Sequence, residues 1–265
     1  MALMVAASIA ATPAAAQVAD EAATLAATAA RGRLMAAYDR AAWLGTDDVQ
    51  ARLTDWRDRL GGWIVDGPVE SPTIVFHDRS QPPRALYSAR LERGSLTGAT
   101  LVQGDAAVLA PERLRLIAAR DAAGKAMGAA GVRPCSSAFN TVVVPPATPD
   151  GPTAVYFLSA QAKANDLPVG GHFRVMVAAD GTAGAPHAFS RGCMTLSPDG
   201  KAKAIAVGVV TTLTGPLPNE AHVFVVEAYR KPLLVLVPGP PQRGFMVEPG
   251  RPIAPFELNR AKGGR

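Results

Sequence analysis

The sequence lacks the short motifs on which most recognisable enzyme classes depend. Its 265 residues include two cysteines and four histidines, and they contain no G-x-S-x-G, S-x-x-K, H-E-x-x-H, P-loop, G-x-G-x-x-G or C-x-x-C motif. These absences exclude the usual forms of serine hydrolase, zinc peptidase, NTPase, dinucleotide-dependent dehydrogenase and thioredoxin-like oxidoreductase.

Long apolar runs and blocks of like charge are also missing. No apolar run reaches the roughly 18 residues that cross a bilayer, so no transmembrane segment is expected in the mature chain. The formal net charge is +5, and the basic residues are dispersed among acidic ones, which argues against nucleic-acid binding. Only residues 260–265 form a small basic cluster. We interpret it as a solvated end, with weak attraction to an anionic membrane or wall polymer as the alternative.

The amino terminus has the pattern of a secretory signal, although it carries no Lys or Arg. A short apolar segment, residues 2–11, is followed by Pro13 and by the run Ala14-Ala15-Ala16. This pattern predicts a signal peptide over residues 1–16 and a periplasmic or secreted protein. An Ala-rich N-terminal helix is the alternative, and a start site further upstream would explain the missing basic residues.

The two cysteines are Cys135 and Cys193. In an oxidising compartment, an isolated pair predicts one disulfide. A closed loop of about 59 residues would stabilise the fold by roughly 4 kcal/mol in the chain-entropy model. The alternative makes Cys193 a nucleophile activated by His187 or His222.

The first part of the expected mature chain reads as a helical segment over residues 17–62. Residues 19–44 are rich in alanine, and Gly45 is expected to end their helix. Thr46 then has the character of an N-cap for a second helix over 47–60. That helix is expected to pack through the stripe Val49, Leu53, Trp56 and Leu60. Together the two helices predict an αα-hairpin.

The remainder, residues 63–265, predicts an α+β domain with one further helix at 111–129, which begins at a proline. From residue 138 the pattern is almost wholly β, with short turns that favour antiparallel pairing. The expected strands in this region are 139–144, 154–159, 172–178, 185–190, 204–213, 221–228 and 233–237. Because residues 221–228 and 233–237 do not alternate, they are expected to be central strands covered on both faces. The predicted fold is therefore α+β, with the N-terminal hairpin and the further helix packed on a mainly antiparallel sheet.

Three histidines of the β region, His172, His187 and His222, are the candidates for a polar site. No pair has the spacing that aims two imidazoles at one metal, so neither a metal nor a cofactor is predicted. Surface positions or hydrogen-bonded structural roles are the simpler interpretation, and no catalytic residue is assigned.

Three segments resemble a family of uncharacterised secreted proteobacterial proteins. They are residues 38–43 (YDRAAW), 62–65 (GWIV) and 135–146 (CSSAFNTVVVPP). The resemblance implies an exported protein without an assigned activity, and it transfers no functional residue.

The leading functional hypothesis is a non-catalytic exported cell-envelope protein, a binding or structural module whose partner is an envelope protein or polymer. One alternative is a periplasmic hydrolase with a Cys–His or carboxylate site. Another is an envelope-complex partner that binds by adding a strand at an exposed sheet edge.

Overall fold

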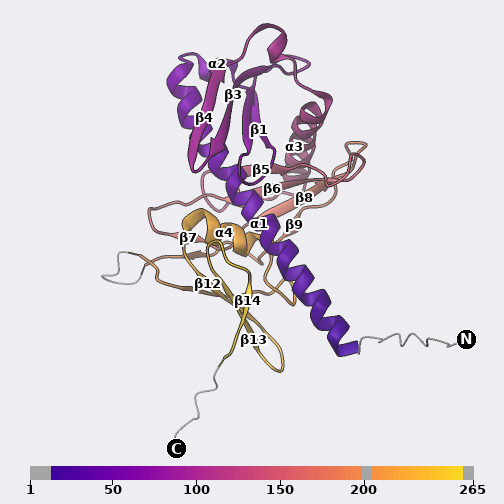
Figure 1. Cartoon of the computed structure of the whole chain (residues 1–265), viewed down its shortest axis with the longest axis vertical. Coiled ribbons are helices and arrows are strands. Elements are labelled where there is room, and N and C mark those ends of the chain that lie inside the picture. Colours follow the sequence, from indigo (N-terminus) through magenta and orange to yellow (C-terminus); the bar gives the residue numbers. More distant parts are fainter. Residues whose placement is uncertain (1–12, 199–203, 259–265) are drawn as a thin grey trace, which may run out of the picture.

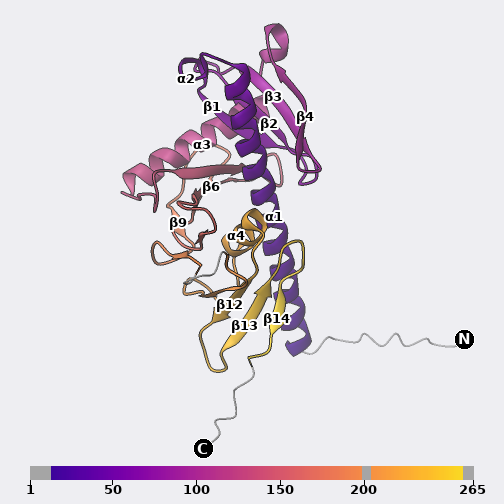
Figure 2. The same ribbon diagram turned by 90° about the vertical axis from the view of Figure 1, so that its left-hand side faces the viewer.

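The protein is built along one long helix, α1 (Pro13–Arg52). In the computed structural model, which describes residues 13–198 and 204–258, α1 runs along most of the length of the molecule (Figures 1 and 2). Its 40 residues correspond to about 60 Å at 1.5 Å per residue. Three four-stranded sheets and two further helices of ten or more residues are arranged beside it. The α+β class is therefore confirmed.

The predicted helical hairpin is wrong, because the chain continues as helix through Gly45. A Cβ atom at Gly45 would lie 3.0 Å from Ile74 Cγ1, so the glycine allows a strand side chain to approach the helix closely. Thr46 is not a cap: its hydroxyl donates to the carbonyl of Ala42, 2.7 Å away, within the same helix. After a short turn, residues 56–59 form only the one-turn helix α2 (Trp56–Arg59).

The expected apolar stripe nevertheless packs against the core. Val49 and Leu53 are buried at the end of α1, and Trp56 and Leu60 are partly buried beside them. The 4-3-4 spacing therefore identified the packing face correctly, although the stripe runs from the end of α1 through a turn to α2 and the residue after it.

The first sheet is an antiparallel meander of four consecutive strands. Its members are β1 (Gly62–Asp66), β2 (Thr73–His77), β3 (Ala85–Glu92) and β4 (Ser95–Leu101). Tyr87, a fully buried residue of β3, donates its hydroxyl hydrogen bond to Asp48 of α1 over 2.7 Å. A 3₁₀ turn, η1 (Gly104–Ala107), then leads to α3 (Pro111–Ala129), which has the bounds predicted from the sequence.

The second sheet has the antiparallel order β5-β6-β8-β9. Its strands are β5 (Phe139–Val144), β6 (Thr153–Ser159), β8 (Phe173–Val177) and the short β9 (His187–Ala188). Helix α3 packs against this sheet and the first one together (Figure 2). Ile117 of α3, Ile64 of β1 and Val155 of β6 belong to one hydrophobic core. The strand predicted at 185–190 is thus reduced to two residues.

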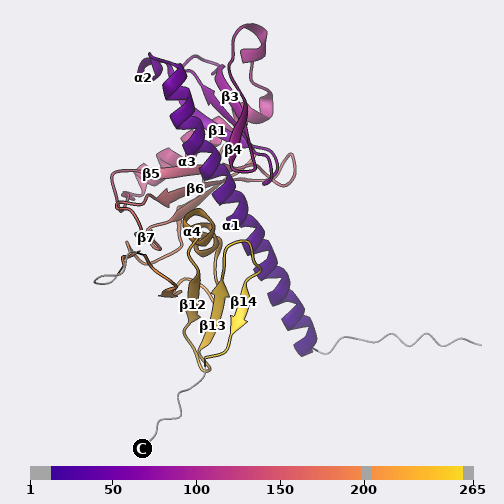
Figure 3. The same cartoon turned by 60° about the vertical axis from the view of Figure 1, so that its left-hand side comes forward.

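The third sheet has the order β11-β12-β13-β14. Figure 3 shows β12, β13 and β14 side by side. Its strands are β11 (Gly208–Thr211), β12 (Leu233–Val237), β13 (Arg243–Val247) and β14 (Ala254–Phe256). β11 and β12 are parallel and are connected through helix α4 (Glu220–Tyr229), whereas the other pairs are antiparallel. A two-stranded ribbon pairs β7 (Leu167–Pro168), which lies between β6 and β8 in sequence, with β10 (Thr195–Leu196), which lies between β9 and β11.

The strand predicted at 221–228 is wrong, because this segment is α4. Asn219 caps the helix: its Oδ1 accepts from the backbone N–H of His222 over 3.2 Å, and His222 Nδ1 accepts from the Asn219 N–H over 3.1 Å. All six residues from 221 to 226 are buried. A short run that is buried on every side shows neither a helical nor a strand period, so its sequence did not distinguish a helix from a strand. Helix α4 packs tightly on α1, where a Cβ at Gly32 would lie 2.4 Å from Val223 Cβ.

Several predictions concern the ends of the chain. The predicted signal peptide over 1–16 falls largely on residues 1–12, which lie outside the described part, as does the basic cluster 260–265.

Of the strand expected over 204–213, residues 208–211 form β11. Within residues 13–198 and 204–258, no helix combines the length and hydropathy needed to cross a membrane.

Candidate functional site

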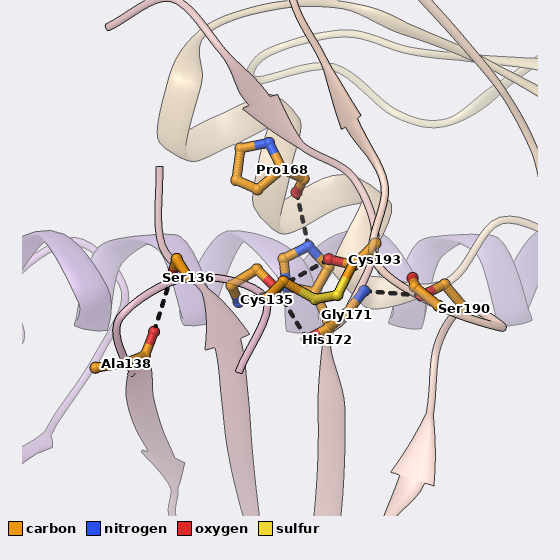
Figure 4. The surroundings of a disulfide bond; sticks show 11 residues. Cys135, Ser136, Ala138, Pro168, Gly171, His172, Ser190 and Cys193 are labelled. Carbon is orange, nitrogen blue, oxygen red and sulfur yellow. Dashed lines mark hydrogen bonds between the residues drawn. A yellow bond between two sulfur atoms is a disulfide. The ribbon is translucent and has the colours of Figure 1, made fainter. Parts of the chain in front are cut away.

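The predicted disulfide is confirmed. Cys135 and Cys193 are bonded, with their Cα atoms 5.6 Å apart (Figure 4). The bond joins the segment between α3 and β5 to the loop between β9 and β10. Because both sulfurs are in the bond, neither is available as a thiolate nucleophile in this structure.

Two consecutive glycines allow the chain to pass beneath this disulfide. Gly171 has φ +75°, and a Cβ there would lie 2.1 Å from Cys135 Sγ. A Cβ at Gly170 would lie 2.6 Å from the carbonyl oxygen of Gly192. The Gly171 N–H donates to Ser190 Oγ over 2.8 Å, which holds the two strands of chain together at this crossing (Figure 4).

His172 is a structural residue of this junction. It is 1% exposed, and its Nδ1 accepts from the Ser159 backbone N–H over 3.1 Å. Its Nε2 donates to the Pro168 carbonyl over 2.8 Å (Figure 4). A backbone N–H can only donate and a carbonyl can only accept, so these partners fix the neutral tautomer. Burial lowers the pKa of His172 to about 4. Since its one lone pair is already engaged, it is not placed to act as a general base.

His222 is also neutral and lies close to His172. Its Nδ1 accepts from the backbone of Asn219, so its proton is on Nε2. Burial, and secondarily the neighbouring His172, lowers the pKa of His222 to about 4. His187, by contrast, is exposed on β9 and packs edge-on against Phe189, with ring centroids 5.1 Å apart. Of the three predicted histidines, the structure therefore brings two together.

A groove lies beside the disulfide, and His222 contributes to its lining. Its walls are residues 189–194, which include Cys193, and residues 209–213 of β11 and its continuation. We call it the β11 groove; its volume is about 450 Å³. Thr212 also lines it, and the Thr212 hydroxyl is buried with no hydrogen-bond partner among the residues that the structure describes. A buried hydroxyl without a partner costs about 1–3 kcal/mol of stability, and such unpaired groups are unusual in a folded core.

One wall of the groove is a sheet edge. Within the described residues, β11 pairs only with β12. The N–H groups of Gly208 and Thr212 donate toward the β12 side, to Pro232 and Leu236, each over 2.9 Å. Backbone groups alternate in direction along a strand, so those of the intervening Val209 and Thr211, and of Leu213 beyond, point toward the open edge.

The rim of the groove is apolar. Val209 and Leu213 are 54% and 51% exposed on one wall, and Met194 is 39% exposed on the other. Among the described residues that line the groove, Arg191 is the only charged one. Exposed apolar sheet edges are normally protected in monomeric proteins, and this one carries neither proline nor lysine between residues 208 and 213.

Sequence reasoning found Cys193 and His222 but missed the groove. His222 was assigned to a strand, whereas it lies in α4 behind β11. Residues 209–213 read Val-Val-Thr-Thr-Leu and do not alternate in polarity, so the sequence did not show that Val209, Thr211 and Leu213 are exposed while Val210 and Thr212 are buried. That this strand is an edge depends on the order of the sheet.

The described residues contain no group of three His, Cys, Asp or Glu side chains that could hold a metal ion. Comparison of the chain with family models, curated proteins and solved structures gives no match. The resemblance to secreted proteobacterial proteins thus stays a prediction.

Proposed function

We propose that the protein is an exported, non-catalytic binding module that accepts an extended peptide segment of a partner protein in the β11 groove. The observation that carries this proposal is the open edge of β11, which faces a groove of about 450 Å³. In this binding mode, known as β-augmentation, the peptide becomes an additional strand of the sheet.

The backbone of β11 supplies the main recognition. The peptide would pair with the outward backbone groups of Val209, Thr211 and Leu213, which β12 does not use. Main-chain hydrogen bonds of this kind give affinity without demanding a particular sequence. The unpaired Thr212 hydroxyl and the His222 Nε2–H in the lining offer additional polar contacts for the bound segment.

The rim defines the preferred peptide chemistry. Val209, Leu213 and Met194 offer exposed apolar surface, so alternate apolar side chains of the peptide are favoured. Arg191 adds a positive charge at the same groove, which favours an acidic residue in the peptide. The preferred ligand is an extended apolar segment that carries one carboxylate.

The disulfide and the buried histidines support the other parts of the proposal. A single bonded cysteine pair is typical of proteins in oxidising compartments, which agrees with export. His172 and His222 each commit a lone pair to a backbone N–H, which supports a non-catalytic role. Mass spectrometry of protein from the native host tests export: a chain starting at Gln17 is expected, whereas an intact Met1 would contradict it.

A displayed library of random linear peptides, selected against the oxidised protein, tests the groove. The selected peptides are then synthesised with a fluorophore, and their affinities are measured by fluorescence anisotropy. Val209→Lys places a charge on the open edge and should weaken binding by about tenfold or more. Val108→Lys is the matched control, because Val108 is 62% exposed and lies outside the groove.

Two outcomes would overturn the proposal. One is selection of no peptide that binds saturably. The other is equal binding of the selected peptides by Val209→Lys, Val108→Lys and the unaltered protein. N-methylation of alternate peptide residues gives a further check, because removal of the pairing N–H groups should abolish binding in one register and spare it in the other.

A further inference from the structure

A second cleft, separate from the β11 groove, lies where α1, β5 and the end of α4 meet. Its volume is about 380 Å³. Its polar and aromatic lining comes from four parts of the chain and comprises Asp39, Arg40, Trp43, Asn140, Gln161 and Tyr229. None of these residues lines the β11 groove.

Asp39 is the most unusual group in this cleft. It is only partly exposed, and within the described residues it has no ion-pair partner. Burial raises the pKa of Asp39 to about 6, although a hydrogen bond with Asn140 opposes the shift. A half-enclosed carboxyl whose titration is displaced in this way, in a cleft, is a common property of binding sites.

Tyr229 and Gln161 form the opposite side. Burial, and then the charge of Asp39, raises the pKa of Tyr229 to about 12, while a hydrogen bond with the Gln161 backbone opposes this. The Gln161 side-chain amide donates to the Asp166 carbonyl over 2.8 Å, and Gln161 also lines the cleft. The phenol, the two amides and the carboxyl thus present both donors and acceptors.

Trp43 supplies an aromatic surface at the edge of the cleft. It is 55% exposed, which is uncommon for an indole, and the Arg40 guanidinium lies 4.5 Å from its ring centroid. Arg40 and Asp39 carry opposite charges, so the charged groups of the lining sum to zero.

We infer that this cleft binds a neutral polyhydroxylated ligand, a sugar unit of a glycan. Vicinal hydroxyls both donate and accept, so they can satisfy a carboxyl, two amides and a phenol at the same time. The apolar face of a sugar ring can then cover the exposed indole. An isolated ammonium ligand would face Arg40, and an isolated anion would face Asp39, so the charge balance favours a neutral ligand.

Isothermal titration calorimetry with chitotetraose, cellotetraose and maltotetraose tests this inference, with the zwitterion glycine and the cation lysine as comparison probes. At least one tetrasaccharide should bind saturably. Asp39→Asn and Trp43→Ala should each weaken that binding by about tenfold. Asp47→Asn is the matched control for the carboxylate, because Asp47 is exposed on the same helix.

The outcomes separate this inference from the peptide groove. Loss of sugar binding in Asp39→Asn with retention in Val209→Lys would support two independent sites. Absence of saturable binding for all three sugars, or binding unaffected by both cleft variants, would overturn the sugar site and leave the groove untouched. A preference for lysine or glycine over the sugars would also overturn it. Thermal melts of each variant ensure that only folded protein is compared.

Discussion

A Cβ atom on Gly171 would lie 2.1 Å from the Sγ atom of Cys135, closer than any non-bonded contact allows. The disulfide and the glycine therefore depend on each other. Gly171→Ala should prevent the bond from closing in its present geometry and remove up to about 4 kcal/mol of loop-closure stabilisation. Thiol titration of the unfolded, unreduced protein should then find free cysteines, whereas the unaltered protein should show none.

Gly181→Ala is the control for backbone strain. Gly181 also has a positive φ, +86°, but a Cβ there would meet nothing within 4 Å. Gly181→Ala should lose only about 1 kcal/mol of stability, the cost of placing alanine at a positive φ, and should keep its disulfide. Equal losses of stability in the two variants, with no free thiol in either, would show that the close approach at Gly171 is unimportant.

The packing of α1 against α4 gives a second prediction. Gly32→Ala should destabilise the protein by about 1–3 kcal/mol, because the new methyl group would overlap Val223. Gly124→Ala in α3 has open space around the new methyl group and should gain about 1 kcal/mol from helix propensity. Urea denaturation of both variants measures the difference, and a gain in both would contradict the close helix contact.

These glycines also show where the sequence was informative and where it was not. Local patterns identified α3 and the stripe that includes Val49 and Leu53, because both depend on residues close together in the chain. The disulfide was predicted because the chain has only two cysteines and an exported protein is expected to oxidise them. Gly45 resembles a helix end in sequence, and only its contact with Ile74 explains why it lies within a helix. The environment of Asp39 depends on Asn140 and Tyr229, which are distant in sequence, so no local pattern could predict it.

The buried histidine of α4 predicts a pH dependence. The pKa of His222 falls from 6.5 to about 4 in the folded protein, so the unfolded chain takes up this proton first as the pH falls. Its contribution to stability is present above about pH 6.5 and is lost toward pH 4, by at most about 3 kcal/mol. His222→Gln retains a capping side chain but cannot titrate. Relative to the unaltered protein, its stability should therefore improve as the pH falls from 7 to 4.5, as measured by urea denaturation. A constant difference across this range would contradict the assignment.

The pH dependence of stability expected from Asp39 has the opposite sign to that from His222. The pKa of Asp39 rises from 3.8 to about 6 on folding, so the folded state holds the proton longer, and stability falls as the pH rises through this interval. Asp39→Asn should consequently stabilise the protein by about 1–3 kcal/mol at pH 7.5 and by little at pH 4. Asp47→Asn should change neither value. Destabilisation by Asp39→Asn at both pH values would show that the carboxyl is not held in an unfavourable environment.

The open edge of β11 is tested most directly by amide hydrogen exchange, followed by NMR, with and without a selected peptide. In the free protein, the amides of Val210 and Thr212, which face β12, should exchange slowly, whereas those of Val209, Thr211 and Leu213 should exchange quickly. Saturation with peptide should slow exchange at Val209, Thr211 and Leu213 and leave the other two unchanged. Saturable binding without protection at these three amides would contradict strand addition at β11.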